Sequence, residues 1–217
     1  MAQITDRFGR PHDSAIAFMV YALVTDNVDP EQLGRVKVKY PYLPNTPDSY
    51  WARLIMPMAG RERGWMTIPE IGDEVLVSFE HGNFERAIIV GSLYNGKDQP
   101  PYANEDEENN LRVFQSRSGH RLTFDDTKGE ERVELVLGNE EISIICDDAE
   151  GKISVYCGGD INITTKDRFS IVSQEFVLKA DEVEITAGSD IVMTGGSEAS
   201  VEGSAQISLK APNVTVN

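Results

Sequence analysis

The sequence contains few of the residues that build most reactive sites. Among 217 residues it has two cysteines, Cys146 and Cys157, and three histidines, His12, His81 and His120. Two cysteines outside any motif argue against a disulfide framework, and the histidines are too far apart for the spacing of metal ligands. We therefore expect no metal and no cofactor, and we interpret Cys157 as a small core residue that follows the parity of Ile153 and Val155.

Long apolar runs are also missing. No run approaches the roughly 18 apolar residues that a membrane-spanning helix needs. The first residues, "MAQITDRFGRPHDS", are polar and lack the apolar region of a secretory signal. We expect a chain that is made in the cytoplasm without a signal peptide.

Positive charge is scarce. The chain has 20 Lys and Arg residues against 36 Asp and Glu residues, a formal net charge of −16. The imbalance is greatest in residues 104–150, with 5 basic against 14 acidic residues. Such a surface repels phosphate backbones, so general nucleic-acid binding is disfavoured.

The acidic residues include pairs that resemble the carboxylate pairs of acid–base catalysts. These pairs are Glu107/Glu108, Asp125/Asp126, Glu130/Glu131 and Asp147/Asp148. Catalytic carboxylates need a cleft that separates their pKa values, whereas these pairs fall in predicted turns and a linker. No G-x-S-x-G nucleophile motif is present either. We expect a protein that is not an enzyme.

Most of the patterning that is present is typical of β-strands. "GRVKVKY" (34–40) alternates apolar and basic residues, "YWARLIM" (50–56) reads as a second strand, and residues 73–94 read as a hairpin around "EHGN". The apolar run 14–24 fits a short helix or a strand. These short strands predict a small barrel at 16–98 that follows an N-terminal extension at 1–15.

Two further segments follow the predicted barrel. Residues 99–115 contain prolines, asparagines and an acidic block, so we interpret them as a linker. Residues 116–151 read as neck strands, two of them around an Asp-Asp-Thr-Lys-Gly turn and a third at "EEISIIC".

Residues 152–217 contain a repeat of eight residues that slips to seven in a few places. Each repeat has apolar residues two positions apart, which places both side chains on one face of a strand. The predicted inward set is Ile153, Val155, Ile161, Ile163, Ile171, Leu178, Val183, Ile185, Ile191, Met193, Val201, Ile207 and Leu209. Such a fixed period is the signature of a stacked helical architecture.

Three arrangements fit this repeat. One chain alone would make fewer than three coils of about 24 residues, which is little for a solenoid that gains stability from its neighbours. An ordinary β-sandwich usually has more aromatic filling than Tyr156, Phe169 and Phe176 provide. We favour three chains winding round a shared axis, with their apolar edges meeting in the centre. The predicted fold class is thus all-β, an N-terminal OB-fold (oligonucleotide/oligosaccharide-binding) barrel followed by an intertwined trimeric triangular β-helix.

The layout resembles the spikes of contractile injection systems. "VTDNVDPEQLGRVKVKYP" (24–41) and residues 64–96 look like the OB barrel of these spikes, and "SRSGHRLTFDDTKGEERVELV" (116–136) looks like their neck. The group includes phage baseplate assembly protein V, the valine-glycine repeat (VgrG) proteins of type VI secretion and extracellular injection particles. The resemblance implies a homotrimeric structural spike that caps the tube, helps to assemble the baseplate and pierces the target envelope.

The departures from these larger proteins predict partners. No hub domain precedes the barrel, so we expect a separate baseplate hub protein, and no lysozyme domain interrupts the linker. The last repeats hold no His-x-His site. We expect a PAAR-type tip protein on Asn213, Val214, Thr215, Val216 and Asn217. The resemblance also implies cargo or effectors and transient contact with the target membrane.

Two other classes of function were weighed. Arg35, Lys37 and Lys39 form a basic strand face with Tyr40 and Tyr42 nearby, as in OB barrels that bind single-stranded nucleic acid. The acidic total and the repeat argue against that alternative. A carbohydrate-binding fibre is a third class, but the repeat shows no aromatic platform for sugars.

Overall fold

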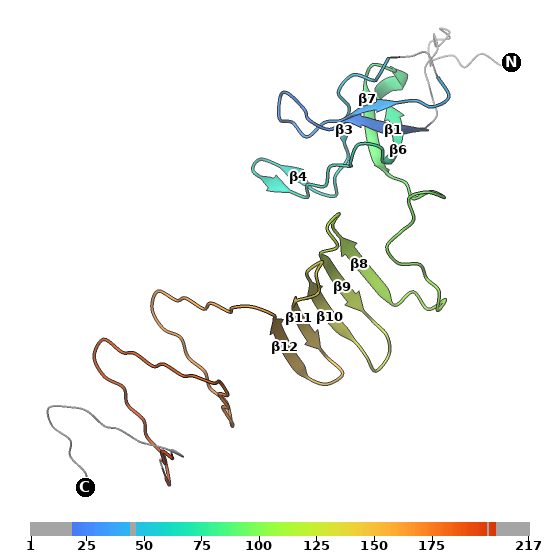
Figure 1. Ribbon diagram of the computed structural model, residues 1–217. Helices are drawn as coiled ribbons and strands as arrows, with labels where there is room; N and C mark the ends of the chain where they lie inside the picture. Colours follow the sequence, from blue (N-terminus) through green and yellow to red (C-terminus); the bar gives the residue numbers. More distant parts are fainter. Residues whose placement is uncertain (1–18, 44–46, 199, 203–217) are drawn as a thin grey trace. The chain divides into compact units, whose positions relative to one another are not determined.

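The computed structural model describes residues 19–43, 47–198 and 200–202, and in this part the chain is built from β-strands without an α-helix (Figure 1). It contains two five-stranded sheets and one two-stranded hairpin. The all-β prediction is confirmed. The chain divides into two units, residues 1–161 and 162–217.

The first sheet forms the barrel. Its strands are β1 (Val20–Asp26), β2 (Lys37–Lys39), β3 (Arg53–Leu54), β6 (Glu74–Phe79) and β7 (Ala87–Ser92). They lie in the order β2-β1-β6-β7-β3, antiparallel except for the parallel pair β3–β7. Val36 and Ala52 exchange backbone hydrogen bonds of 3.0 and 2.8 Å next to β2 and β3. This bridge joins the two ends of the sheet.

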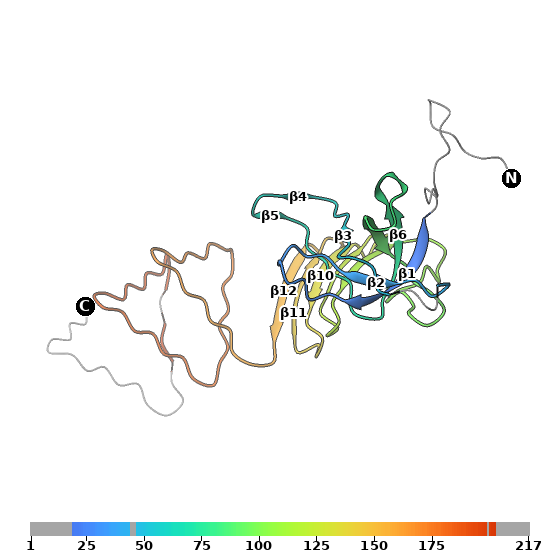
Figure 2. The same ribbon diagram turned by 90° about the horizontal axis from the view of Figure 1, so that it is seen from above.

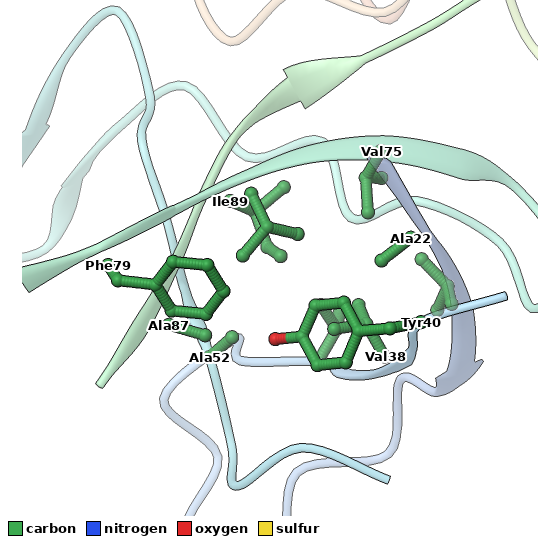
Figure 3. Packing of buried hydrophobic residues seen from close by; sticks show 11 residues of the cluster. Ala22, Val38, Tyr40, Ala52, Val75, Phe79, Ala87 and Ile89 are labelled. Carbon is green, nitrogen blue, oxygen red and sulfur yellow. The ribbon is translucent and has the colours of Figure 1, made fainter. Parts of the chain in front are cut away.

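The barrel interior is filled by alternate residues of its strands (Figure 3). Val36, Val38 and Tyr40 are all fully buried, whereas the intervening Lys37 and Lys39 are not. The rest of the buried cluster is Ala22, Val24, Ala52, Val75, Val77, Phe79, Ala87 and Ile89. The predicted alternation is therefore confirmed, because successive side chains of a strand point to opposite faces.

Two turns of the barrel region deserve separate description. The hairpin β6–β7 is closed by the 3₁₀ turn η1 (Glu80–Gly82), at the predicted "EHGN", with His81 in the left-handed region at φ 53°. A small hairpin, β4 (Ala59–Gly60) and β5 (Arg63–Gly64), was not predicted from the sequence. The ambiguous run 14–24 is a strand from Val20 onward, and its first residues lie outside the described part.

The second sheet is an antiparallel meander in the order β12-β11-β10-β9-β8 (Figure 1). Its strands are β8 (Leu111–Gln115), β9 (Arg121–Asp125), β10 (Arg132–Val136), β11 (Ile142–Asp147) and β12 (Lys152–Cys157). β8 falls in the segment interpreted as a linker. β12, interpreted as the first repeat of the needle, pairs with β11 over six residue pairs.

The described residues after β12, 158–198 and 200–202, form straight runs joined by bends (Figure 2). In the described residues the backbone bends at 158–159, 166–167, 174, 181, 188–189 and 196–197. These positions recur every seven or eight residues, which is the period of the sequence repeat.

Candidate assembly surface

The strand register of the meander places most of its apolar residues on one face. One row across the sheet contains Phe114, Leu122, Leu135, Ile144 and Val155, which are paired in order from β8 to β12. A second row on the same face begins at Arg112 of β8 and continues with Phe124, Val133, Cys146 and Ile153. Ile142 and Cys157 are paired on this face as well. We call these eleven apolar residues the apolar face.

The apolar face is uncovered in the single chain. Its side chains are from 37% exposed at Val133 to 73% exposed at Ile153, apart from the half-buried Leu122 and Cys157. Contiguous apolar surface of this kind on a soluble protein marks an interaction site. Burying one large aliphatic or aromatic side chain fully is worth about 1.5–3 kcal/mol.

The opposite face of the meander mixes charged residues with apolar ones such as Val113, Val136 and Ile145, and its ion pairs form within the chain. Arg132 lies 2.7 Å from Glu134 and 3.5 Å from Asp125, and Arg121 lies 3.3 Å from Glu140. The pKa of Asp125 is lowered, chiefly because the Thr127 hydroxyl donates a hydrogen bond to it, with backbone N–H and Arg132 charge adding to the effect. Thr123, Asp125 and Val136 on this face are already buried within the chain, whereas most of the apolar face is exposed.

Alternation in the sequence predicts β9, β10, β11 and the first repeat at β12, but it reveals neither β8 nor the common face of the apolar residues. The signal was present in the alternation of "RLTFD", "RVELV" and "ISIIC". It places Leu122 with Phe124, Val133 with Leu135, and Ile142 with Ile144. Only the register between the strands aligns these pairs with one another.

The repeat beyond β12 lacks backbone hydrogen-bond partners within the single chain. Between residues 160 and 202, leaving out residue 199, the described backbone makes no backbone–backbone hydrogen bond. Buried backbone groups in folded proteins are nearly always paired, and strand edges without partners attract other strands. The repeat therefore presents both unpaired strand edges and uncovered apolar side chains.

The predicted axis residues are all exposed where the structure describes them. The eleven described members, Ile153 to Val201, are between 52% and 73% exposed. Ile207 and Leu209, and the predicted tip residues Asn213 to Asn217, lie outside the described residues. The assignment of these residues to a shared axis stays a prediction.

The side chains of the basic strand face are not free to bind nucleic acid in the way that the nucleic-acid alternative needs. Arg35 is held by Asp29, with Nη2–Oδ1 and Nε–Oδ2 distances of 2.7 and 2.8 Å, and by Glu31 at 3.1 Å. Tyr40 is fully buried, so its ring cannot stack on a base. Burial raises its pKa to about 12, with a smaller contribution from Tyr42. Lys37 lies over the Trp51 ring at 5.0 Å. These contacts at Arg35 and Tyr40 argue further against the nucleic-acid alternative.

The structure also places the residues considered for catalysis or metal binding. His120 Nδ1 accepts a 3.0 Å hydrogen bond from the Gly138 N–H, and His81 lies in the β6–β7 turn. Within the described residues, no group of three or more His, Cys, Asp and Glu side chains has the arrangement of a metal site. The same residues contain no helix with the length and apolar character that crossing a membrane requires.

The fold and surface define a class: an all-β protein with a small OB-type barrel, an antiparallel sheet with one uncovered apolar face, and a periodic extended repeat. Comparison with known proteins makes the class more specific. Residues 20–94 match the family described as type VI secretion system/phage-baseplate injector OB domain. The predicted OB barrel and the resemblance to injection-system spikes are thereby confirmed.

Individual relatives support the same conclusion. The chain is 34% identical over 113 residues to the type VI secretion system spike protein VgrG3 of Vibrio cholerae serotype O1, covering 48% of this chain and 11% of the relative. It is 32% identical over 131 residues to the spike protein VgrG1a of Pseudomonas aeruginosa, covering 55% and 20%. The actin cross-linking toxin VgrG1 of Vibrio cholerae is 31% identical over 113 residues, covering 48% and 10%. The aligned region is thus a small part of each of these longer relatives.

Proposed function

We propose that the protein is the central spike of a contractile phage tail or a phage-tail-like injection system. It acts as a homotrimer that caps the tube, helps to assemble the baseplate and pierces the target envelope. The similarity to proteins named as spikes supports this proposal. The observation that carries it is the exposed apolar face of the meander, which is followed along the chain by a repeat that lacks partners for its backbone.

An assembly of three copies would cover the apolar faces and also supply backbone partners for the repeat. If each meander forms one side of a triangular prism, three apolar faces meet on the axis and the three ion-paired faces point away from it. Ile153 and Val155 belong to the apolar face, so the inward edge predicted for the repeat begins within the meander. Strands of neighbouring copies would then pair with the unpaired backbone beyond residue 160.

The proposed work is mechanical and needs no turnover. A prism whose layers are hydrogen-bonded to the layers above and below is stiff along its axis. Contraction of a sheath would supply the energy, and the spike would supply shape and stiffness. In this role the protein is not an enzyme, and it acts within an assembled virion tail or tail-like particle.

The proposed partners follow from the resemblance. A separate baseplate hub protein would hold the barrel, and a PAAR-type tip protein would bind at residues 213–217. Cargo or effectors and transient contact with the target membrane complete the set.

The first experiment is the mass of the purified protein in solution, together with two matched variants. Val155 and Tyr156 are adjacent in β12, on opposite faces, and are 59% and 57% exposed in the single chain. Val155→Asp would bring three carboxylates to the axis, and burying unpaired charge there costs several kcal/mol. We expect the wild type and Tyr156→Asp at three times the 24.0 kDa chain mass, and Val155→Asp at the chain mass or aggregated.

The matched exposure of the two side chains makes this comparison decisive. A monomeric fold would tolerate both substitutions equally. A wild-type mass equal to that of one chain would refute the trimer, and trimers of equal stability for both variants would refute the apolar face as its interface.

A further inference from the structure

The bends of the repeat reveal a common register for its straight segments. Each segment starts directly after a bend, and its apolar pair stands at the second and fourth positions. The six segments in the described part begin at Asp160, Arg168, Glu175, Glu182, Asp190 and Glu198. They therefore align without gaps as DINI, RFSI, EFVL, EVEI, DIVM and EASV.

The first position of every segment is charged, and it lies on the face opposite the apolar pair. The third and fifth positions share that outer face. In the segment that begins at Glu182, the Thr186 hydroxyl donates a 3.1 Å hydrogen bond to the Glu184 carboxylate, so these two side chains lie on one side. Val183 and Ile185 are the apolar pair of the same segment.

The first-position residues do not all carry charge of the same sign. Arg168 is basic, while the other five first-position residues are acidic. Residues 160–202 hold 3 basic against 9 acidic residues. Arg168 is exposed, and no ion pair joins it, Asp160 or Glu175 to any described residue.

A shared-axis helix determines which segments become neighbours. At each bend a chain passes to the next side of the prism and rises by one layer. That side is occupied one layer below by the preceding segment of another copy. Segment 168–173 of one copy therefore lies over segment 160–165 of a second copy and under segment 175–180 of the third. Adjacent layers are about 4.8 Å apart.

We propose that Arg168 of each copy forms an ion-pair ladder with Asp160 of one neighbour and Glu175 of the other, and that this ladder sets the register of the three chains. The inference rests on the proposed trimer and adds to it a residue that specifies how the chains align. Within one chain these three residues belong to three different sides of the prism, so the pairs form only between copies.

The other first-position residues, stacked in successive layers, explain why Arg168 would influence the register. Above Glu175 the stacked neighbours are Glu182, Asp190 and Glu198, so each of those steps opposes like charges. Like charges directly opposite in neighbouring strands are destabilising. The steps at Arg168 are the attractive ones among the described first positions. A chain shifted by one layer would replace them with other pairings.

The register can be tested by disulfide cross-linking of the full chain. Arg168→Cys combined with Glu175→Cys places the two Cα atoms of neighbouring copies at about 4.8 Å, within the range of about 4.4–6.8 Å that disulfides bridge. We expect oxidation to convert this double variant into a covalent trimer on a denaturing gel. Arg168→Cys with Glu182→Cys is the mismatched control, because two layers separate its cysteines by more than about 7 Å.

The three single-cysteine variants, Arg168→Cys, Glu175→Cys and Glu182→Cys, report any cross-linking to the native Cys146 and Cys157. Native mass is measured first for the wild type and every variant, so a wild type that forms no trimer refutes the proposed function and is distinguished from a wrong register. Trimers in which the matched pair does not cross-link, or in which the mismatched pair cross-links equally well, overturn the inference.

The energetic role of the ladder has a separate readout. Arg168→Glu should lower the thermal midpoint of the trimer by several degrees, more at low ionic strength because salt screens exposed charges. Adding Glu175→Arg gives opposite charges at the steps 168–175 and 175–182 and should recover most of the loss. A reversal that leaves the midpoint unchanged at low salt, or a loss that the second substitution deepens, would overturn the electrostatic role.

Discussion

Asp29 organises the loop between β1 and β2. Its side chain is 3% exposed and accepts hydrogen bonds from the backbone N–H groups of Glu31 and Leu33, each at 3.0 Å, and of Arg35 at 3.3 Å. The Arg35 guanidinium adds two more at 2.7 and 2.8 Å. One carboxylate thus holds a loop of the barrel and neutralises a cation on its surface.

These contacts predict a pH-dependent contribution to stability. The Arg35 guanidinium, helped by the backbone N–H groups, holds the pKa of Asp29 far below its usual range despite the opposing effect of burial. A carboxylate with a depressed folded-state pKa stabilises the fold above its unfolded pKa of about 3.9, and this stabilisation is lost as the pH falls toward the folded value. We expect Asp29→Asn to lower the thermal midpoint of the barrel by several degrees at pH 7.

The measurement is tryptophan fluorescence during unfolding, because both tryptophans, Trp51 and Trp65, lie in the barrel region. The difference between the wild type and Asp29→Asn should be constant from pH 7 to about 5 and shrink below about 4. Asp26→Asn is the control, since Asp26 accepts one hydrogen bond, from the Val28 N–H. A difference that grows on acidification would contradict this account.

At the scale of the element, substitutions at adjacent positions of the repeat can test which of its two faces points to the proposed axis. Ile185 and Thr186 are adjacent and both exposed in the single chain, but Ile185 belongs to the predicted axis. Ile185→Asp would place three like charges at one level of the axis and should abolish trimer formation. Ile163→Asp should act in the same way.

Thr186→Asp is the matched control and should leave the trimer intact, with a small loss from repulsion by Glu184. Sedimentation or native mass spectrometry reports both outcomes. A normal trimer for Ile185→Asp would show that the apolar pairs do not face the axis.

The elements differ in how much of them could be predicted. The hairpin β6–β7 and the strands β9, β10 and β11 were predicted, because alternation and turn residues are local signals. β8 was assigned to the linker because its "LRVFQ" follows directly on an acidic, asparagine-rich block. β4 and β5 are two residues each and have no alternation to detect.

At the scale of the whole molecule, the proposed tip contact has its own test. Removing residues 212–217 should abolish binding of a PAAR-type protein while leaving the trimer intact, because most of the proposed axis residues remain. Binding is measured by co-purification with the PAAR-type protein, and native mass checks the trimer. Equal binding by the full-length and shortened chains would exclude these residues as the tip site.

The sequence by itself determined the all-β class, the barrel, the neck strands and the period of the repeat. Each of these rests on a short-range pattern: side chains of a strand alternate with period two, and bends recur with the eight-residue repeat. The resemblance carried by "GRVKVKY" and residues 64–96 was confirmed for the same reason, since it lies in contiguous residues.

Tertiary structure decided the features that depend on residues far apart in the chain. The bridge between Val36 and Ala52 joins the ends of the barrel sheet, and Asp29 removes Arg35 from the basic face. The strand register assembles Phe124, Val133, Cys146 and Ile153 into one row of the apolar face. A shift of one residue in any strand would turn its apolar side chains to the other face, and no local pattern excludes that shift.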